Sequence, residues 1–353
     1  MSGVGRRRRA VAVTGAGSGL GAALLVRLTQ RPDLDRLVGV AAPFGGTGEG
    51  TGGPDEDPAA RQELAARLAG VTTVVHLATS YDLTAPAEQR RRLNTAGTAV
   101  LLDAARDAGV RRVVLTTSSA VYGVRADNPV PLPDAAPLGA PDDGRTLTGD
   151  HVEVERLAEH AARTGLAVTV LRPASLVGGG LGPAYEGQLL RLLSGPRLLA
   201  VRGVEPVWQL CHVDDLLSAL ELVAVGSGSG RYGVASEGGL AQSRVEAMAG
   251  RRRLELPASV ALSTAERLRR AGVTTSSPRE LDHVLGPLVV ACDGLRAAGW
   301  RPDWTNESAL GAHLVGRAQG GGRSAAAAGA TGATVALVST AALVRRARRR
   351  RGR

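Results

Sequence analysis

The chain of 353 residues contains no lysine, because all 43 of its basic residues are arginines. Arginine replaces lysine readily on a surface, but it does not take over the work of a catalytic ammonium group. Aromatic residues make up only 2% of the chain, so Ala, Val and Leu must fill the core. The only cysteines, Cys211 and Cys292, lack the spacing of a metal or redox motif, which favours reduced, buried thiols and predicts no metal site.

Positive charge is concentrated at the two ends of the chain. The net charge is +10, and residues 6–9 and 345–353 hold most of the excess arginine. Basic termini can contact nucleic acid or anionic lipid, but no zinc-finger, helix-turn-helix or RNA-recognition motif accompanies them, so we expect no specific nucleic-acid partner. A short strand and glycines follow residues 6–9 in place of a sustained apolar run, so no secretory signal is expected.

The C-terminal tail leaves the location of the protein open. Residues 324–344 are Ala, Gly, Thr, Val, Leu and Ser, and polyarginine follows them. This stretch is just long enough to cross a bilayer, although Ala, Gly and Thr favour insertion only weakly. A cytoplasmic protein is predicted. Three alternatives stay open for residues 324–353. They anchor the protein in a membrane or contact its anionic lipids, they form a helix on the protein's own surface, or they are a disordered tail.

Apolar stretches of strand type alternate with amphipathic stretches of helix type along most of the chain. This alternation, with short connections, predicts an α/β fold built on a Rossmann-type, doubly wound parallel sheet. The expected strands are residues 10–14, 37–40, 73–77, 112–117 and 168–172, and the expected helices are residues 20–28, 64–68, 94–108 and 152–162.

A glycine-rich loop joins the first expected strand to the first expected helix. Glycines let the backbone turn tightly and approach a pyrophosphate, and the helix N-terminus behind them offers unpaired N–H groups and the positive end of its dipole. Its place between a strand and a helix makes the loop a strong indication of a dinucleotide cofactor. The residues expected to bind the cofactor here are Thr14, Gly15, Gly17, Ser18, Gly19, Leu20 and Gly21.

The second expected strand does not identify the cofactor. A carboxylate after this strand normally binds the ribose hydroxyl of NAD, whereas a nearby arginine accommodates the phosphate of NADP. Ala41 stands at that position and no arginine replaces it, so the cofactor is predicted as NAD or NADP without distinction. We expect a dinucleotide-binding Rossmann domain at 10–177 and a smaller substrate-covering region at 178–316, from which residues 208–222 return to the main sheet. An Ala/Gly-rich tail ending in polyarginine follows at 317–353.

Seven motifs occur in order between Val11 and Pro302. On these motifs the chain resembles the extended short-chain dehydrogenase/reductase family, in its NAD-dependent epimerase/dehydratase group, which acts mostly on nucleotide sugars. They are the glycine loop, Asp57-Pro58 leading to 74–78, residues 94–98, residues 113–119 with Val121-Tyr122-Gly123, Leu171-Arg172-Pro173, residues 212–215 and residues 298–302.

The resemblance implies roles for individual residues. Ser118, four positions before Tyr122, would be the catalytic serine that hydrogen-bonds a substrate oxygen. Asn94 would brace the backbone of the active site. Members of the family often form homodimers through helices of the type 94–108 and 152–162. The cofactor-binding positions carried over, besides the glycine loop, are His76, Leu77, Ala78, Asn94, Thr116, Thr117, Arg172 and Pro173.

The chain departs from the family at its catalytic Tyr-x-x-x-Lys pair. Alignment of the helix at 152–162 puts Leu147 at the tyrosine position and His151 at the lysine position. In active relatives the tyrosine exchanges the hydroxyl proton, while the lysine lowers the tyrosine pKa and holds the nicotinamide ribose. His151 is a candidate for the ribose contact and the proton step, or else an ordinary polar residue of a first turn. Tyr81 is the other catalytic candidate, or else a loop aromatic that covers the pocket.

Other polar residues are expected to have structural roles. Asp214 and Asp215 are predicted to cap a helix or to pair with Arg172, since no His/Asp cluster surrounds them. Glu153 and Glu155 are predicted to be solvated charges on different faces of one helix.

Two kinds of function remain open. One is an NAD(P)-binding oxidoreductase or epimerase of divergent mechanism, which acts on a nucleotide-sugar-like or other small carbonyl or hydroxyl substrate. The alternative is a non-catalytic NAD(P)-binding regulatory or redox-sensing protein, with or without membrane association through its tail, because fold alone does not imply activity.

Overall fold

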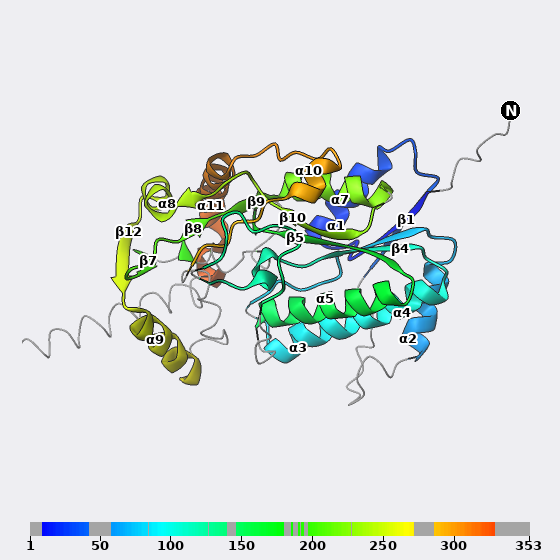
Figure 1. Cartoon of the computed structure of the whole chain (residues 1–353), viewed down its shortest axis with the longest axis horizontal. Coiled ribbons are helices and arrows are strands. Elements are labelled where there is room, and N and C mark those ends of the chain that lie inside the picture. Colours follow the sequence, from blue (N-terminus) through cyan, green and yellow to red (C-terminus); the bar gives the residue numbers. More distant parts are fainter. Residues whose placement is uncertain are drawn as a thin grey trace, which may run out of the picture.

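The computed structural model describes residues 9–41, 58–83, 85–125, 127–139, 146–179, 185, 190, 192–193, 197–226, 228–271 and 286–328. A parallel sheet of six strands in the order β10-β5-β4-β3-β1-β2 forms the centre of the molecule (Figure 1). This architecture confirms the predicted α/β fold class. The strands are β1 (Ala10–Thr14), β2 (Arg36–Val40), β3 (Thr73–His76), β4 (Arg112–Thr116), β5 (Ala167–Pro173) and β10 (Gly230–Val234).

Helices cover both faces of this sheet (Figure 1). Successive side chains of a strand point to opposite faces, so Val11 and Val13 of β1 pack with α1 and α7, whereas Ala12 packs with α2 and α4. Every residue of β1 is therefore buried, as expected for a central strand of a doubly wound sheet. The helices are α1 (Gly19–Thr29), α7 (Val213–Val225) and α10 (Asp293–Ala297) on one face, and α2 (Pro58–Arg67), α4 (Gly97–Asp107) and α5 (Leu147–Arg163) on the other.

The helix expected at 94–108 begins earlier than predicted and is not regular. It starts with α3 (Ala87–Arg91), passes through one π-helical turn, η2 (Arg92–Ala96), and continues as α4. A π turn inserts one extra residue into a helix and is frequent at functional sites, and here it contains Asn94. Sequence periodicity missed the first turns because α3 is rich in charged residues.

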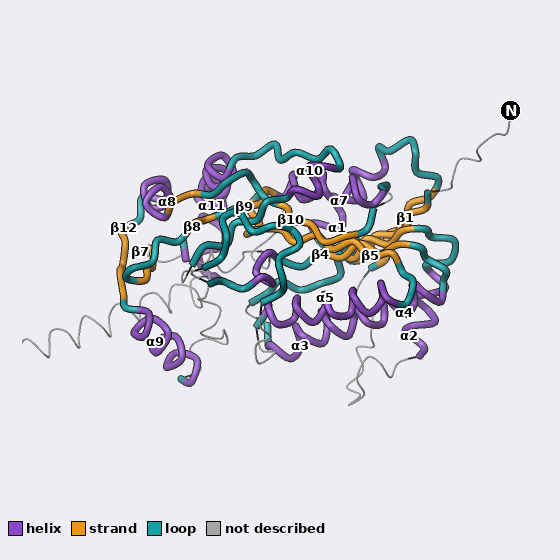
Figure 2. The backbone as a smooth tube through the Cα atoms, viewed as in Figure 1, coloured by secondary structure: helices purple, strands orange, loops and turns teal. Residues whose placement is uncertain are grey.

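A smaller layer holds most of the C-terminal half and has its own core around Leu198, Trp208 and Leu310. Figure 2 shows its short strands beside the large sheet. Its elements are β6 (Ser175–Val177) with β9 (Leu210–His212), β7 (Arg197–Val201) with β12 (Arg252–Leu256), β8 (Val207–Trp208) with β11 (Leu240–Ala241), and helices α8 (Gln242–Ala249), α9 (Ala258–Arg270) and α11 (Asn306–Ala328).

After residue 178 the chain returns to the main sheet through α7, β10 and α10. Helix α7 packs on strands β3, β4 and β5, and β10 adds the sixth strand beside β5. The boundaries of the Rossmann domain at 10–177 and of the substrate-covering region at 178–316 stay a prediction. Of the tail, α11 extends to Ala328, and the rest of the apolar stretch at 324–344 lies outside the described residues. Within the described ranges, no helix has the length and apolar character needed to span a membrane.

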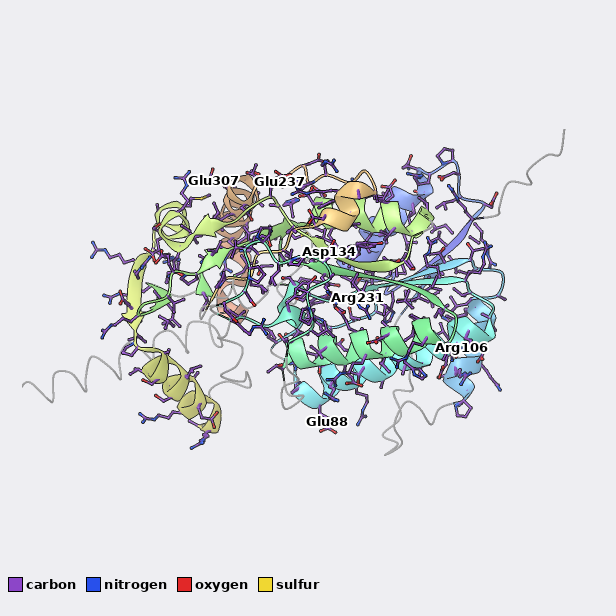
Figure 3. All side chains as sticks on the ribbon, viewed as in Figure 1. Glu88, Arg106, Asp134, Arg231, Glu237 and Glu307 are labelled. Atoms are coloured by element: carbon purple, nitrogen blue, oxygen red, sulfur yellow. The ribbon has the colours of Figure 1, made fainter. Side chains whose placement is uncertain are left out.

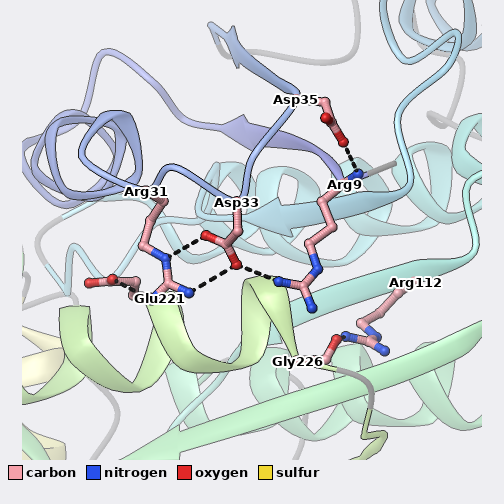
Figure 4. Close-up of polar contacts among 7 residues, drawn as sticks. All are labelled: Arg9, Arg31, Asp33, Asp35, Arg112, Glu221 and Gly226. Carbon is pink, nitrogen blue, oxygen red and sulfur yellow. Dashed lines mark hydrogen bonds and ion pairs between the residues drawn. The ribbon is translucent and has the colours of Figure 1, made fainter. Parts of the chain in front are cut away.

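A polar network links Arg9, just before β1, and the turn between α1 and β2 to helix α7 (Figure 4). Arg31 donates to Asp33 from Nε at 2.9 Å and to Glu221 of α7 from Nη1 at 3.2 Å. Arg9 bonds the same Asp33 carboxylate, and its backbone N–H donates to Asp35 at 2.7 Å. The hydrogen bond from Arg31 lowers the pKa of Asp33 to about 2. The network holds this edge of the fold in one arrangement. Because its groups are partly exposed, the ion pairs add little to the free energy of unfolding.

Candidate functional site

The glycine loop lies at the point where the strand order of the sheet reverses, between β1 and β3. Ligands of doubly wound proteins bind outside the carboxyl ends of the strands at such a point. Gly15 has a φ of +69°, and a Cβ there would lie 2.6 Å from the carbonyl oxygen of Leu77. A Cβ on Gly21 would lie 2.1 Å from the carbonyl oxygen of Gly15, whereas a Cβ on Gly17 would meet nothing within 4 Å. Gly15 and Gly21 thus allow neighbouring stretches of backbone to come into contact, whereas Gly17 borders open space.

The first turn of α1 continues this cradle. Ser18 caps the helix by accepting a 3.0 Å hydrogen bond from the N–H of Gly21. The remaining N–H groups at a helix start favour an anion. Leu20 turns away into the core, being 1% exposed. The hydroxyl of Tyr185, a half-buried residue from the C-terminal part, bonds the Ser18 side chain. The cradle fits the diphosphate of a dinucleotide.

His76 lies beneath the cradle as a buried brace. Its Nδ1 is 2.7 Å from Oγ1 of Thr14, and this oxygen accepts a 3.2 Å hydrogen bond from the N–H of Leu77. Its Nε2 is 3.3 Å from Oγ1 of Thr98 on α4. Burial lowers the pKa of His76 to about 4, so the ring is neutral at physiological pH. The imidazole therefore positions the end of β3, and the chain at Leu77 and Ala78 passes against Gly15.

Asn94 holds the loop after β3. Its Oδ1 accepts from the N–H of Ser80 at 2.7 Å, and its Nδ2 donates to the Ser80 carbonyl at 2.9 Å. Behind it, Nε of Arg90 donates to Asp150 of α5 at 2.8 Å, and both of these side chains are buried. Burial raises the pKa of Asp150, although the ion pair with Arg90 opposes that effect. Asn94 therefore holds the Ser80 backbone in place, and its predicted role toward a cofactor stays a prediction.

His151 is buried without any hydrogen-bond partner. The residue is 1% exposed, and neither Nδ1 nor Nε2 has a hydrogen-bond partner among the described residues. Burial lowers its pKa to about 3, so the ring is neutral. A buried polar group left unpaired costs roughly 1–3 kcal/mol, and such a group in a native fold calls for an explanation such as a bound ligand. Leu147, one turn earlier in α5, is 7% exposed and adds an apolar wall.

Tyr81 and Ser118 stand at the same edge. The hydroxyl of Tyr81 donates to the carbonyls of Thr117, at 3.1 Å, and Thr116, at 3.3 Å. The Tyr81 ring centroid is 5.2 Å from that of His151. Ser118 caps the short helix η3 (Ser119–Tyr122) by accepting from the N–H of Ala120 at 3.2 Å, which leaves its own proton for a ligand. The buried Oγ1 of Thr116 is another polar atom here without a partner.

Glu155 contradicts its predicted solvation, because its side chain is 0% exposed. Its Oε1 accepts from Nε of Arg172 at 2.8 Å and from Oγ1 of Thr117 at 3.0 Å. Its Oε2 accepts a second bond from Arg172, and Nε of Arg231 lies 3.5 Å away. Arg231 is labelled in Figure 3. The sequence signal that could have revealed it is the spacing of four from His151, which places both side chains on one face of α5.

Arg172 forms its ion pair with Glu155, so the predicted pairing of Arg172 with Asp214 or Asp215 is wrong. Its guanidinium also lies over the ring of Tyr122, 4.6 Å from the centroid, in keeping with a packing role for Tyr122. Asp215 instead accepts from the backbone N–H groups of Asp303, at 2.8 Å, and Trp304, at 3.3 Å. Asp214 is exposed beside His212. Pro173 ends β5 and is paired in register with Val234 of β10.

The family model for the NAD dependent epimerase/dehydratase family matches residues 11–232. The chain belongs to this family. An uncharacterized protein of Mycobacterium tuberculosis is 31% identical over 324 residues, which cover 88% of this chain and 84% of that protein. The 3-diazoavenalumate denitrifying reductase of a Streptomyces species is 42% identical over 135 residues, 37% of this chain and 42% of that protein.

Solved structures share the fold at low identity. MoeE5 in complex with UDP-glucuronic acid and NAD aligns with a TM-score of 0.62 and 22% identity, covering 88% of this chain and 99% of that one. A UDP-glucose 4-epimerase from Thermotoga maritima aligns with a TM-score of 0.63 and 16% identity, covering 88% and 98%. The cofactor of the family is NAD or NADP, and the glycine cradle fits it. Ala41 is exposed at the end of β2, where an acid would select NAD.

In the described part of the chain, no cluster of His, Cys, Asp or Glu could hold a metal ion. Cys211 and Cys292 are buried and free. Burial raises the pKa of both thiols, which suits inert core residues.

Proposed function

We propose that this protein is an NAD(P)-dependent oxidoreductase with a divergent catalytic site. Its substrate is a small carbonyl or hydroxyl compound, and a nucleotide sugar is one such class. The observation that carries the proposal is the unpartnered His151, buried at the same sheet edge as the glycine cradle. A polar group buried at a cost is expected where a ligand completes its hydrogen bonds.

Each group at this edge has a part in the proposal. The backbone of Gly15, Gly19 and Gly21 and the first turn of α1 bind the diphosphate. When bound, the nicotinamide supplies or accepts a hydride. His151 accepts a hydrogen bond from a ribose hydroxyl, in place of the family lysine. Ser118 donates a hydrogen bond to a substrate oxygen, and the ring of Tyr81 forms a wall of the pocket.

The curated relatives support oxidoreductase chemistry. One is named a denitrifying reductase, and another, from Stigmatella aurantiaca, is named a 4-hydroxy-2-methyl-3-oxo-4-farnesyl-3,4-dihydroquinoline-1-oxide ketoreductase and is 27% identical over 169 residues. Both names describe net reduction. A reductase is therefore the form of the proposal that these relatives support best. Homodimer formation through α4 and α5, and a membrane contact of residues 324–353, remain predictions.

Calorimetric titration with NAD and NADP, oxidised and reduced, tests the proposal. We expect micromolar binding of at least one form. Replacing His151 by Leu should weaken that binding roughly 3- to 10-fold, the value of one hydrogen bond. His160→Leu is the matched control, because His160 is exposed on the same helix. If none of the four forms binds, the proposal is wrong.

A second function, NAD(P) binding without catalysis, is favoured by one observation. Leu147, the residue predicted to stand at the family tyrosine position, can neither donate nor accept a proton. The two functions differ in an exchange experiment with cofactor deuterated at the transferred position. Deuterium appearing in any added carbonyl compound would exclude the non-catalytic function. If Ser118→Ala left that transfer unchanged, the role of Ser118 would be refuted.

A further inference from the structure

A buried ion pair lies directly behind the site. Nε of Arg90, on α3, donates to Oδ2 of Asp150, on α5, at 2.8 Å, and the two side chains are 4% and 0% exposed. Taking two charges out of water is costly, and replacing such a pair by apolar side chains of similar size is often neutral or stabilising. Stability alone therefore does not account for a charged pair at this position.

The Asp150 carboxylate also faces the π turn η2. Nδ2 of Asn94 lies 3.5 Å from the same oxygen, Oδ2, that Arg90 bonds. Arg90 and Asn94 are four residues apart, a spacing that puts two side chains on one side of a helix. Asn94 in turn bonds both the N–H and the carbonyl of Ser80, at 2.7 Å and 2.9 Å. The ion pair is thus linked through Asn94 to the loop that follows β3.

The two ends of this linkage meet again on the ligand side. Tyr81 is the residue after Ser80, and His151 is the residue after Asp150 in the first turn of α5. The ring centroids of Tyr81 and His151 are 5.2 Å apart. The contacts and the backbone therefore close a ring that runs through Asp150, Asn94, Ser80, Tyr81 and His151.

The position of Arg90 also bears on the state of His151. Burial, and after it the charge of Arg90, lowers the pKa of His151 to about 3. A neutral imidazole keeps one nitrogen that accepts a hydrogen bond, whereas an imidazolium has only donors. Arg90 thus lies close enough to favour the form of His151 that can accept a bond from a ribose hydroxyl.

We propose that Arg90 and Asp150 are positioning residues, which hold His151 and Tyr81 where these two meet the nicotinamide half of the cofactor. The proposal rests on the proposed function and adds to the site two residues that act from behind it. Removing the pair should cost the hydrogen bond assigned to His151 and leave the glycine cradle as it is. Little or no stability should be lost, because two charges no longer have to be kept out of water.

The test is calorimetric titration of full-length variants with two ligands. One is the cofactor that the wild type binds most tightly, and the other is ADP, which carries the half assigned to the glycine cradle but no nicotinamide ribose. In Arg90→Met combined with Asp150→Leu, cofactor binding should weaken about 3- to 10-fold, the value of one hydrogen bond. The affinity for ADP should be unchanged, and the melting temperature unchanged or higher. Glu153→Leu combined with Arg156→Met is the matched control, because it removes a partly exposed ion pair of α5.

A second set of variants tests whether the pair acts through His151. In a His151→Leu background the same double replacement should have no further effect on cofactor affinity, since the hydrogen bond is already lost, whereas independent contributions would add. Arg90→Lys keeps a positive charge beside Asp150, so its cofactor affinity should lie within about 3-fold of the wild-type value. If melting curves show that the double variant is not folded, Asp150→Asn replaces it, because an amide of the same size removes only the charge.

Three outcomes would overturn the inference. They are an unchanged cofactor affinity in the folded double variant, an equal loss of affinity for ADP and for the cofactor, and full additivity with His151→Leu. The second of these would show that the pair only supports the fold. All three leave the proposed function standing, because the wild type still binds the cofactor. Absence of cofactor binding by the wild type is the separate result that removes the proposed function itself.

Discussion

Replacing Glu155 by Gln should be among the most damaging single changes in this fold. The carboxylate collects two bonds from Arg172 and one from Thr117, with Arg231 at 3.5 Å. Glu155 is 0% and Arg172 1% exposed, so water cannot compensate for a lost partner. An amide would remove the negative charge and turn an N–H₂ group toward guanidinium donors. The buried Arg172 would keep its charge without a counterion.

The expected cost is about 3–5 kcal/mol, the usual penalty for removing one member of a buried ion pair. Urea unfolding at neutral pH measures it as a shift of the midpoint at constant slope. Glu159→Gln is the matched control on the same helix. Its side chain is 54% exposed and pairs with Arg163 and Arg231, so a loss of about 0–1 kcal/mol is expected.

A double variant separates the charge from the packing. Glu155→Leu combined with Arg172→Met replaces both partners by apolar side chains of similar size, which is often neutral or stabilising for buried pairs. We expect it to recover most of the stability that Glu155→Gln loses. If Glu155→Gln costs less than about 1 kcal/mol, the pair is not the buried link between α5 and β5 that the geometry indicates.

Three further outcomes follow from the same edge of the sheet. Gly15→Ala should lower both the melting temperature and cofactor affinity, because its Cβ would strike the Leu77 carbonyl, whereas Gly17→Ala should leave the melting temperature unchanged and weaken only cofactor binding. Stability should fall as the pH drops below 6.5, since the folded-state pKa values of His76 and His151, about 4 and about 3, lie below the unfolded value and unfolding takes up protons. Urea titrations at a series of pH values give the free energy of unfolding as a function of pH. Between the folded and unfolded pKa values, this free energy should change by about 1.4 kcal/mol per pH unit for each histidine, and His151→Asn should remove the contribution of one. If the variant has the same pH dependence as the wild type, His151 is already charged in the folded protein.

The glycine loop illustrates how much local sequence decides. A strand, a run of glycines and a helix start are neighbours along the chain, so their order alone indicated the cradle that the fold contains. The same holds for the parallel strands, whose apolar runs need no distant information to be recognised. The helix at 87–107 was only partly predictable, because charged residues in its first turns mask the apolar period.

Contacts between distant segments were beyond the sequence pattern. Glu155 looks like a solvated charge until β5 brings Arg172 against it, and Tyr185 joins the site only because the fold places it against Ser18. That His151 has no partner is likewise a property of packing. By itself, the sequence determined the α/β class, the glycine cradle and the loss of the Tyr-x-x-x-Lys pair, since these depend on residue type and short spacing. Only the tertiary structure decided which polar groups are paired and which are buried without a partner, because burial and pairing depend on what long-range folding places beside them.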